Sequence, residues 1–206
     1  MQSKHYPTGT VRALLETDMV TPQTRIALLE RLNRETTAAP RFFDAAAYAT
    51  LCAVCARLIP QPERPHPIDL AGAIDGRLAQ KEGDGWRYDQ MPPDGEAHRR
   101  GLLALDESAQ LLFGGNFHEL DEAQQDQLLL LVQRNEVSGG TWETIQASRF
   151  FEELLAGATE SYYSHPLAQE EIGFVGMADA HGWQLIKLDE LEAREPQALE
   201  DERERV

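Results

Sequence analysis

The sequence predicts an all-α protein, a single irregular helical bundle that ends in an aromatic- and glycine-rich C-terminal segment. Apolar residues recur at spacings of three and four in several stretches, and each stretch is bounded by a capping residue, a proline or a glycine. Alternating β-branched segments, which would indicate strands, do not occur in the sequence. With 206 residues, 42% of them hydrophobic, the chain can enclose one substantial core.

Residues 1–39 are expected to form an N-terminal extension with one helix, in the stretch TPQTRIALLERLN. Thr21 is its expected N-cap, and Pro22 occupies the first helical position, where a missing N–H costs nothing. The apolar stripe of this helix is expected to comprise Ile26, Leu29 and Leu32.

The expected helical domain, residues 40–188, begins with a central helix in FFDAAAYATLCAVCARLIP, capped by Asp44 and stopped by Pro60. Its expected core positions are Ala47, Leu51, Val54, Cys55 and Leu58. Cys52 and Cys55 form a CxxC motif, but no second cysteine pair exists, and alanine follows where haem attachment needs histidine. We therefore interpret both cysteines as small core residues.

Four further helices are expected, in IDLAGAIDGRLAQ, AHRRGLLALDESAQLLF, ELDEAQQDQLLLLVQRN and TIQASRFFEELLAGATESYY. In the third, Asp121 and Gln124 form a capping-box pair ahead of the run from Leu128 to Val132. That run is apolar on every side, which indicates a helix buried between its neighbours. The other expected core positions are Ile74, Leu78, Leu102, Leu105, Ala109, Leu112, Phe150, Leu154 and Ala158.

The formal net charge of −16 argues against nucleic-acid binding, because phosphate contacts need a basic face. No apolar run approaches the roughly 20 residues that span a bilayer, so membrane insertion is not expected. The stretch MQSKHYPTGTVRALLETDMV has no hydrophobic signal core and no twin arginine. We therefore expect a cytoplasmic protein, with the periplasm as the alternative if a partner exports it.

The C-terminal segment YYSHPLAQEEIGFVGMADAHGWQLIKL shows neither helical nor strand periodicity. Its candidate metal ligands or acid–base groups are His165, Glu170, Glu171, Asp179 and His181. They are scattered over an irregular segment, whereas catalytic zinc ligands usually include a close pair on one rigid element. No GxGxxG, P-loop, GxSxG or HExxH motif occurs either. We expect no catalytic, cofactor-binding or metal-binding residues in this chain.

Several stretches, in their order and spacing, resemble the gluconate 2-dehydrogenase subunit 3 family. They are FFDAAAYATLCAVCARLIP, AGAIDGRLA, HRRGLLALDESAQLLFGGNFHELDEAQQDQLLLLV, RFFEELLAGATESYYSHP and a final GW. The resemblance covers about residues 40–188. It implies a non-catalytic, accessory or chaperone-like small subunit of a FAD-dependent carbohydrate dehydrogenase complex. The FAD is then expected in a large partner subunit of the glucose-methanol-choline type, which oxidises a sugar hydroxyl.

The resemblance also implies a role for the C-terminal segment as a partner-binding surface, because rigid aromatics with a polar tip are typical interface anchors. The expected partner-binding residues are Tyr162, Tyr163, His165, Pro166, Phe174 and Trp183. Alternatively, the segment covers the protein's own helices. Alternative functions are a stand-alone helical binding or scaffold protein and a small metal-dependent enzyme. Residues 189–206 are charged and lack caps, so we expect a disordered acidic tail.

Overall fold

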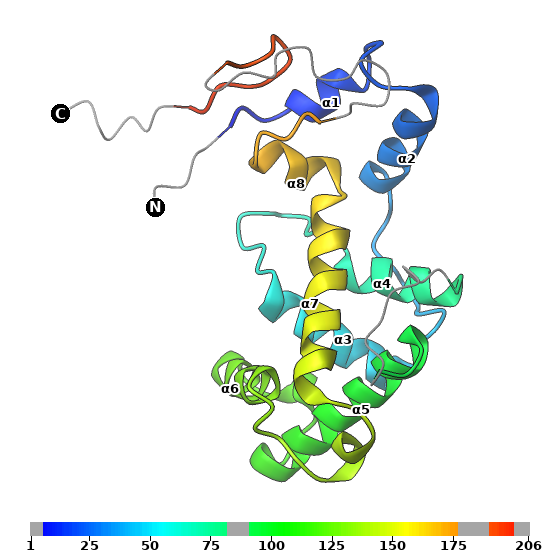
Figure 1. Cartoon of the computed structure of the whole chain (residues 1–206), viewed down its shortest axis with the longest axis vertical. Coiled ribbons are helices and arrows are strands. Elements are labelled where there is room, and N and C mark those ends of the chain that lie inside the picture. The colour runs from blue at the N-terminus through cyan, green and yellow to red at the C-terminus, as the bar shows by residue number, and fades with distance from the viewer. Residues whose placement is uncertain (1–5, 82–90, 177–189, 200–206) are drawn as a thin grey trace, which may run out of the picture. The chain divides into compact units, whose positions relative to one another are not determined.

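The computed structural model of the chain describes residues 6–81, 91–176 and 190–199. All regular elements in these ranges are helices (Figure 1), which confirms the all-α expectation. The helices are α1 Thr10–Leu14, α2 Pro22–Leu32, α3 Ala45–Leu58, α4 Leu70–Ala79, α5 Asp94–Phe113, η1 Phe117–Glu119, α6 Glu122–Gln133, η2 Gly140–Thr144, α7 Ala147–Tyr163 and α8 Pro166–Glu171, where η denotes a 3-10 helix.

The helices form two compact units, where a single bundle was expected. Both ends of the chain, residues 1–35 and 162–206, make up the terminal unit, and residues 36–161 make up the central unit. The domain limits expected from the sequence, at residues 40 and 188, stay a prediction. Among the described residues, no helix combines the length and the apolarity that crossing a bilayer requires.

Helix boundaries follow the capping signals of the sequence. The Asp44 carboxylate accepts the N–H of Ala47 at 2.9 Å and starts α3, and Asp121 with Gln124 forms the capping box of α6. Helix α5 ends at Gly114, whose φ of +81° lies in the left-handed region that favours glycine. These caps act through atoms a few residues apart, so sequence alone locates them.

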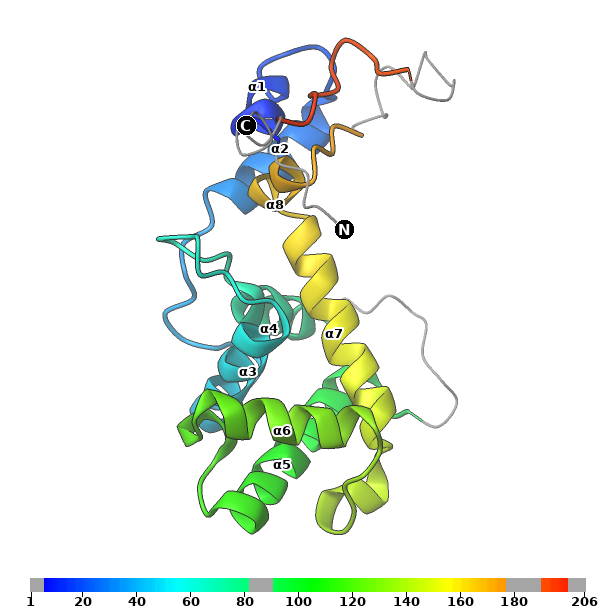
Figure 2. The same ribbon diagram turned by 90° about the vertical axis from the view of Figure 1, so that its left-hand side faces the viewer.

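The central unit is built around α3 and α5, which pack against each other and against η1 and α6 (Figure 2). A Cβ atom on Gly101 would overlap the Phe150 ring, so glycine lets this ring of α7 lie against the α5 backbone. The largest apolar side chains below 2% exposure here are Phe117, Phe150, Leu51, Ile74, Leu102, Leu105, Leu128 and Leu154. The expected burial of Ile74, Leu78, Leu102, Leu105, Ala109, Phe150, Leu154 and Ala158 is thus confirmed.

Some expected core positions are wrong. Leu112 in the last turn of α5 is 49% exposed, and Leu130 is 42% exposed because α6 buries Leu128, Leu129 and Val132 on one side only. In α2, Ile26 is 58% exposed, and the buried residue is its neighbour Leu28. Helical periodicity identifies an apolar face, but only the neighbouring elements decide how much of that face is covered.

The terminal unit contains two helices in its N-terminal part, not the single one expected. Helices α1 and α2 both contact α8, which forms in a segment expected to lack periodic structure (Figure 1). Val11, Leu15, Val20 and Leu28 form its buried apolar cluster. Within the acidic tail, residues 190–199 contain a turn, where Arg194 and Glu192 pair at 3.0 Å. The expected disorder stays a prediction for residues 200–206, which lie outside the described residues.

A buried carboxylate of α4 binds the segment that precedes α3 in the central unit. Asp75 of α4 has no exposed surface and accepts the backbone N–H groups of Arg41, Phe42 and Phe43 at 2.7, 3.0 and 3.0 Å. Asp69 caps α4 through Gly72 and also accepts the N–H of Thr37. Both carboxylates thereby attach the segment that precedes α3 to α4.

Replacing Asp75 tests this attachment. We expect Asp75→Ala to lower the free energy of unfolding by about 3 kcal/mol, because it leaves three backbone donors without their acceptor. Asp75→Asn keeps the shape and one acceptor oxygen, so its loss should be smaller. Urea unfolding followed by circular dichroism measures both. Equal stability of Asp75→Ala and the wild type would contradict this role.

His98 of α5 is a buried titratable group in the same unit. Its Nδ1–H donates to the carbonyl of Asp94 at 2.8 Å, and its Nε2 has no hydrogen-bond partner among the described residues. Burial lowers the pKa of His98, and the nearby Arg77 guanidinium lowers it further, against the opposing effect of Asp94. The folded protein therefore holds this imidazole neutral.

The free energy of unfolding should consequently fall as the pH drops below 6.5, the ordinary pKa of histidine. In this range the unfolded imidazole binds a proton that the folded one does not, so acidification favours unfolding. In His98→Asn, whose amide can replace Nδ1–H, the part of the slope below pH 6.5 that comes from this histidine should vanish. Urea unfolding at a series of pH values gives the difference between the two proteins. If the free energy of unfolding falls with pH in parallel in the two proteins, His98 is not the source of this pH dependence.

Candidate partner interface

The structure describes five of the six expected partner-binding residues, and their exposure differs. Tyr162 is 8% exposed and Pro166 is buried, whereas Tyr163 and Phe174 are 43% and 46% exposed. His165 is partly buried. Trp183 lies outside the described residues, so its role stays a prediction. Tyr162 and Pro166 therefore belong to the core of the terminal unit, and Tyr163 and Phe174 are available to a partner.

Helix α8 positions these residues, and His165 is its N-cap. The Nδ1 atom of His165 accepts the N–H of Leu167 at 3.2 Å, and Pro166 occupies the first helical position. Capping is thus the role of this imidazole that the structure shows. The signal for α8 was present in the sequence, because a proline directly after a polar residue is typical of a helix start.

Gln169 joins the two exposed aromatic residues through their backbones. Its side-chain amide donates to the carbonyl of Tyr163 at 3.1 Å, and its backbone carbonyl accepts the N–H of Phe174 at 2.9 Å. The rings of Tyr162 and Tyr163 meet edge to face at 5.1 Å between centroids. Ile172, just before Gly173, is also 48% exposed. We call Tyr163, Ile172 and Phe174 the exposed apolar group.

The two carboxylates considered as metal ligands have other roles. Glu170 has a side-chain exposure of 5%, and it accepts the backbone N–H groups of Gly9 and Arg12 and two N–H groups of the Arg12 guanidinium. The hydroxyl of Tyr162 donates to Glu171 at 2.5 Å. Asp179 and His181 lie outside the described residues. Elsewhere in residues 6–81, 91–176 and 190–199, no three His, Cys, Asp or Glu side chains are grouped to hold a metal.

The surroundings of Glu170 keep it ionised. Burial by itself would raise the pKa of this carboxyl, but the hydrogen bonds from Arg12 and from two backbone N–H groups outweigh burial. The pKa of Glu170 therefore lies below its ordinary value. In return, the hydrogen bond to Glu170 raises the pKa of Arg12. Glu170 is the buried member of this ion pair, whereas the Arg12 side chain is 45% exposed. The four hydrogen bonds to the carboxylate offset the cost of burying its charge.

The CxxC motif is inert at neutral pH. Cys55 is 5% exposed, and burial raises the pKa of its thiol to about 12. Desolvation and the charge of Asp69 also raise the pKa of Cys52. Both thiols are free and stay protonated, and only a thiolate is a nucleophile or metal ligand. The interpretation of Cys52 as a core residue is wrong, because its side chain is exposed.

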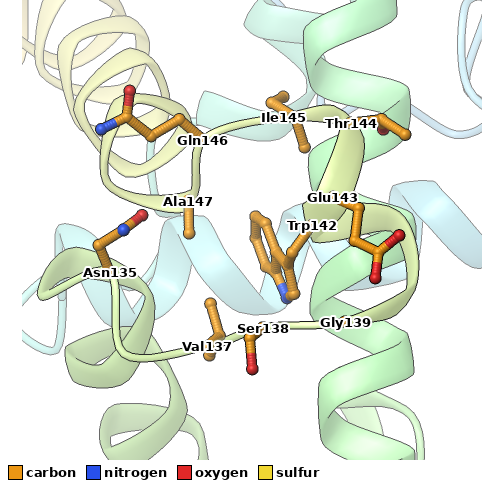
Figure 3. A pocket seen from close by; sticks show the side chains of 10 residues that line it. All are labelled: Asn135, Val137, Ser138, Gly139, Trp142, Glu143, Thr144, Ile145, Gln146 and Ala147. Carbon is orange, nitrogen blue, oxygen red and sulfur yellow. The ribbon is translucent and has the colours of Figure 1, made fainter.

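The loop between α6 and α7 lines an open cavity of about 490 Å³ in the central unit (Figure 3). Val137, Trp142, Ile145 and Ala147 converge on it, and the indole N–H of Trp142 donates to Ser108 at 2.8 Å. Glu143 is the single titratable residue in the wall. Polar side chains of Asn135, Ser138, Thr144 and Gln146 complete the lining beside these apolar ones. Sequence patterns did not indicate this cavity.

Comparison with known proteins identifies the family. No curated protein and no solved structure matches the chain. The family model of gluconate 2-dehydrogenase subunit 3 matches residues 45–187, which include α3 to α8 and leave α1 and α2 outside. Membership in this family implies a small subunit of a dehydrogenase complex. The match covers well over half of the chain and confirms the resemblance seen in the sequence, so the protein belongs to the gluconate 2-dehydrogenase subunit 3 family.

Proposed function

We propose that this chain is the non-catalytic small subunit of a FAD-dependent carbohydrate dehydrogenase. In this role it binds and stabilises a large flavoprotein subunit of the glucose-methanol-choline type, which oxidises a sugar hydroxyl. The family match over residues 45–187 carries the proposal. The complex is proposed to reside in the cytoplasm, or in the periplasm if the partner takes this chain across the membrane.

The terminal unit offers a surface suited to such a partner. Tyr163, Ile172 and Phe174 are each more than 40% exposed, whereas the adjoining Tyr162 and Val175 are buried. Aromatic side chains of this kind contribute most of the binding energy of many interfaces, since they bury a large apolar area at small entropic cost. The formal net charge of −16 favours a partner surface rich in Lys and Arg.

The first test is whether the neighbouring gene encodes a large dehydrogenase with a GxGxxG motif after its first strand. The second is to produce this chain together with that large subunit. An affinity tag on this chain should retain the large subunit with its FAD. The large subunit produced alone should contain less FAD or be less soluble. Failure of the tagged chain to retain it, with both proteins folded, would refute the proposal.

The exposed aromatics should matter for binding and hardly for folding. Tyr163→Ala and Phe174→Ala should each weaken the complex by about 2 kcal/mol, the usual size for an interface anchor. Neither change should lower the melting temperature of the isolated chain by much, since both side chains are nearly half exposed. Titration of the large subunit and thermal unfolding of each variant give the two quantities.

Tyr162→Ala is the matched control for this prediction. Tyr162 adjoins Tyr163, but it is buried and hydrogen-bonded to Glu171, so its removal should cost about 3 kcal/mol of stability. A loss of stability without a loss of binding in Tyr163→Ala would assign that residue to the core instead.

The purified chain should also carry no flavin or haem. Its sequence has no nucleotide-binding motif, and both cysteine thiols are held protonated. The visible absorption spectrum of the isolated chain should therefore be flat, and added FAD should give no turnover of a sugar with a dye acceptor. A flavin band at one equivalent per chain would contradict the assignment of FAD to the partner.

A further inference from the structure

The N-terminal extension and helix α8 lie together in the terminal unit, although they have different relations to the family. Helices α1 and α2 precede residue 45, where the family match begins, whereas α8 lies inside the match. Both α1 and α2 contact α8 (Figure 1). A segment outside the family region thus packs against the part of the chain that bears the exposed apolar group.

The two parts are joined by a hydrogen-bonded ion pair. Glu170 accepts the N–H of Gly9 at 2.8 Å and the N–H of Arg12 at 3.1 Å. The Arg12 guanidinium adds hydrogen bonds at 3.1 Å from Nε and 2.9 Å from Nη2. Arg12 thus binds the carboxylate as a fork, the geometry that gives the strongest and most directional ion pairs. Because Glu170 is buried, losing these donors would leave an uncompensated charge.

Contacts on either side of this ion pair extend the attachment. The guanidinium of Arg31 in α2 donates to the carbonyl of Ser164 at 3.0 Å, just before α8. After α8, the ring of Tyr6 lies so close to Gly173 that a Cβ atom there would overlap it. Gly173 also has a φ of +65°. The extension therefore contacts the segment before, within and after α8.

These contacts involve residues next to the exposed apolar group or hydrogen-bonded to it. Gly173, which Tyr6 touches, stands between Ile172 and Phe174. Gln169, next to Glu170, bonds to the backbones of Tyr163 and Phe174. Any movement of Glu170 away from Arg12 would consequently move the residues that set the spacing of the exposed side chains.

We infer that the N-terminal extension is a clasp that preorganises the partner-binding surface, with Arg12 and Glu170 as its positioning residues. The inference rests on the proposed function and deepens it, since it assigns a binding role to a part of the chain outside the family match. The partner fitted by the surface is the large flavoprotein subunit. A surface held in its bound shape binds more tightly, because less conformational freedom is lost on association.

Arg12→Ala in the full-length chain removes the two guanidinium hydrogen bonds of the clasp and leaves the exposed apolar group unchanged. We expect the dissociation constant for the large subunit to rise about tenfold, because the binding-competent shape is then less populated. Amide hydrogen exchange in residues 162–176 should become faster. Arg12→Lys keeps the charge but loses the fork, so it should restore part of the affinity and serves if the alanine variant does not fold.

Arg57→Ala is the matched control. Arg57 of α3 binds Asp126 of α6 through the same two atoms, Nε and Nη2, at 2.7 and 2.6 Å, but in the central unit. It should leave the affinity and the exchange of residues 162–176 unchanged. Wild-type affinity in Arg12→Ala would overturn the clasp, and tighter binding would show instead that the extension competes with the partner. A wild-type chain that binds no large subunit would overturn the proposed function and the clasp with it.

Discussion

In each compact unit, a buried carboxylate accepts backbone N–H groups from a distant segment and holds that segment in place. In the terminal unit Glu170 binds Gly9 and Arg12 from the other end of the chain, and in the central unit Asp75 binds residues 41–43. Burying a charge in an apolar interior is costly unless hydrogen bonds compensate it. The packing around each unit therefore depends on keeping these donors in place.

Adjacent residues in the candidate partner surface differ sharply in exposure. Tyr162 and Tyr163 are neighbours with touching rings, yet the first is buried and bonded to Glu171 and the second is nearly half exposed. The segment 162–176 is thus both part of the core of the terminal unit and a candidate surface for the large subunit. Burial assigns Tyr162 to the protein's own core, and the interface interpretation stays a prediction for the exposed Tyr163 and Phe174.

The family and most of the helices could be predicted from the sequence, because the signals for them are local. Helix caps, stop signals and the periodicity of apolar residues act over a few residues, as the Asp44 cap of α3 and the capping box of α6 illustrate. Short helices such as α1 and α8 were missed because too few turns are present for a periodic pattern. For α8 the His165–Pro166 start was the only local signal.

By itself, the sequence determined the all-α class, the caps and the family to which the chain belongs. The tertiary structure alone decided which apolar residues stay exposed and what each carboxylate binds. Glu170 stands among several acidic residues of the segment, and its partner Arg12 is 158 positions away, so no local pattern could select it as the buried one. Contacts between distant segments depend on how the helices pack, and that packing is a property of the folded chain as a whole.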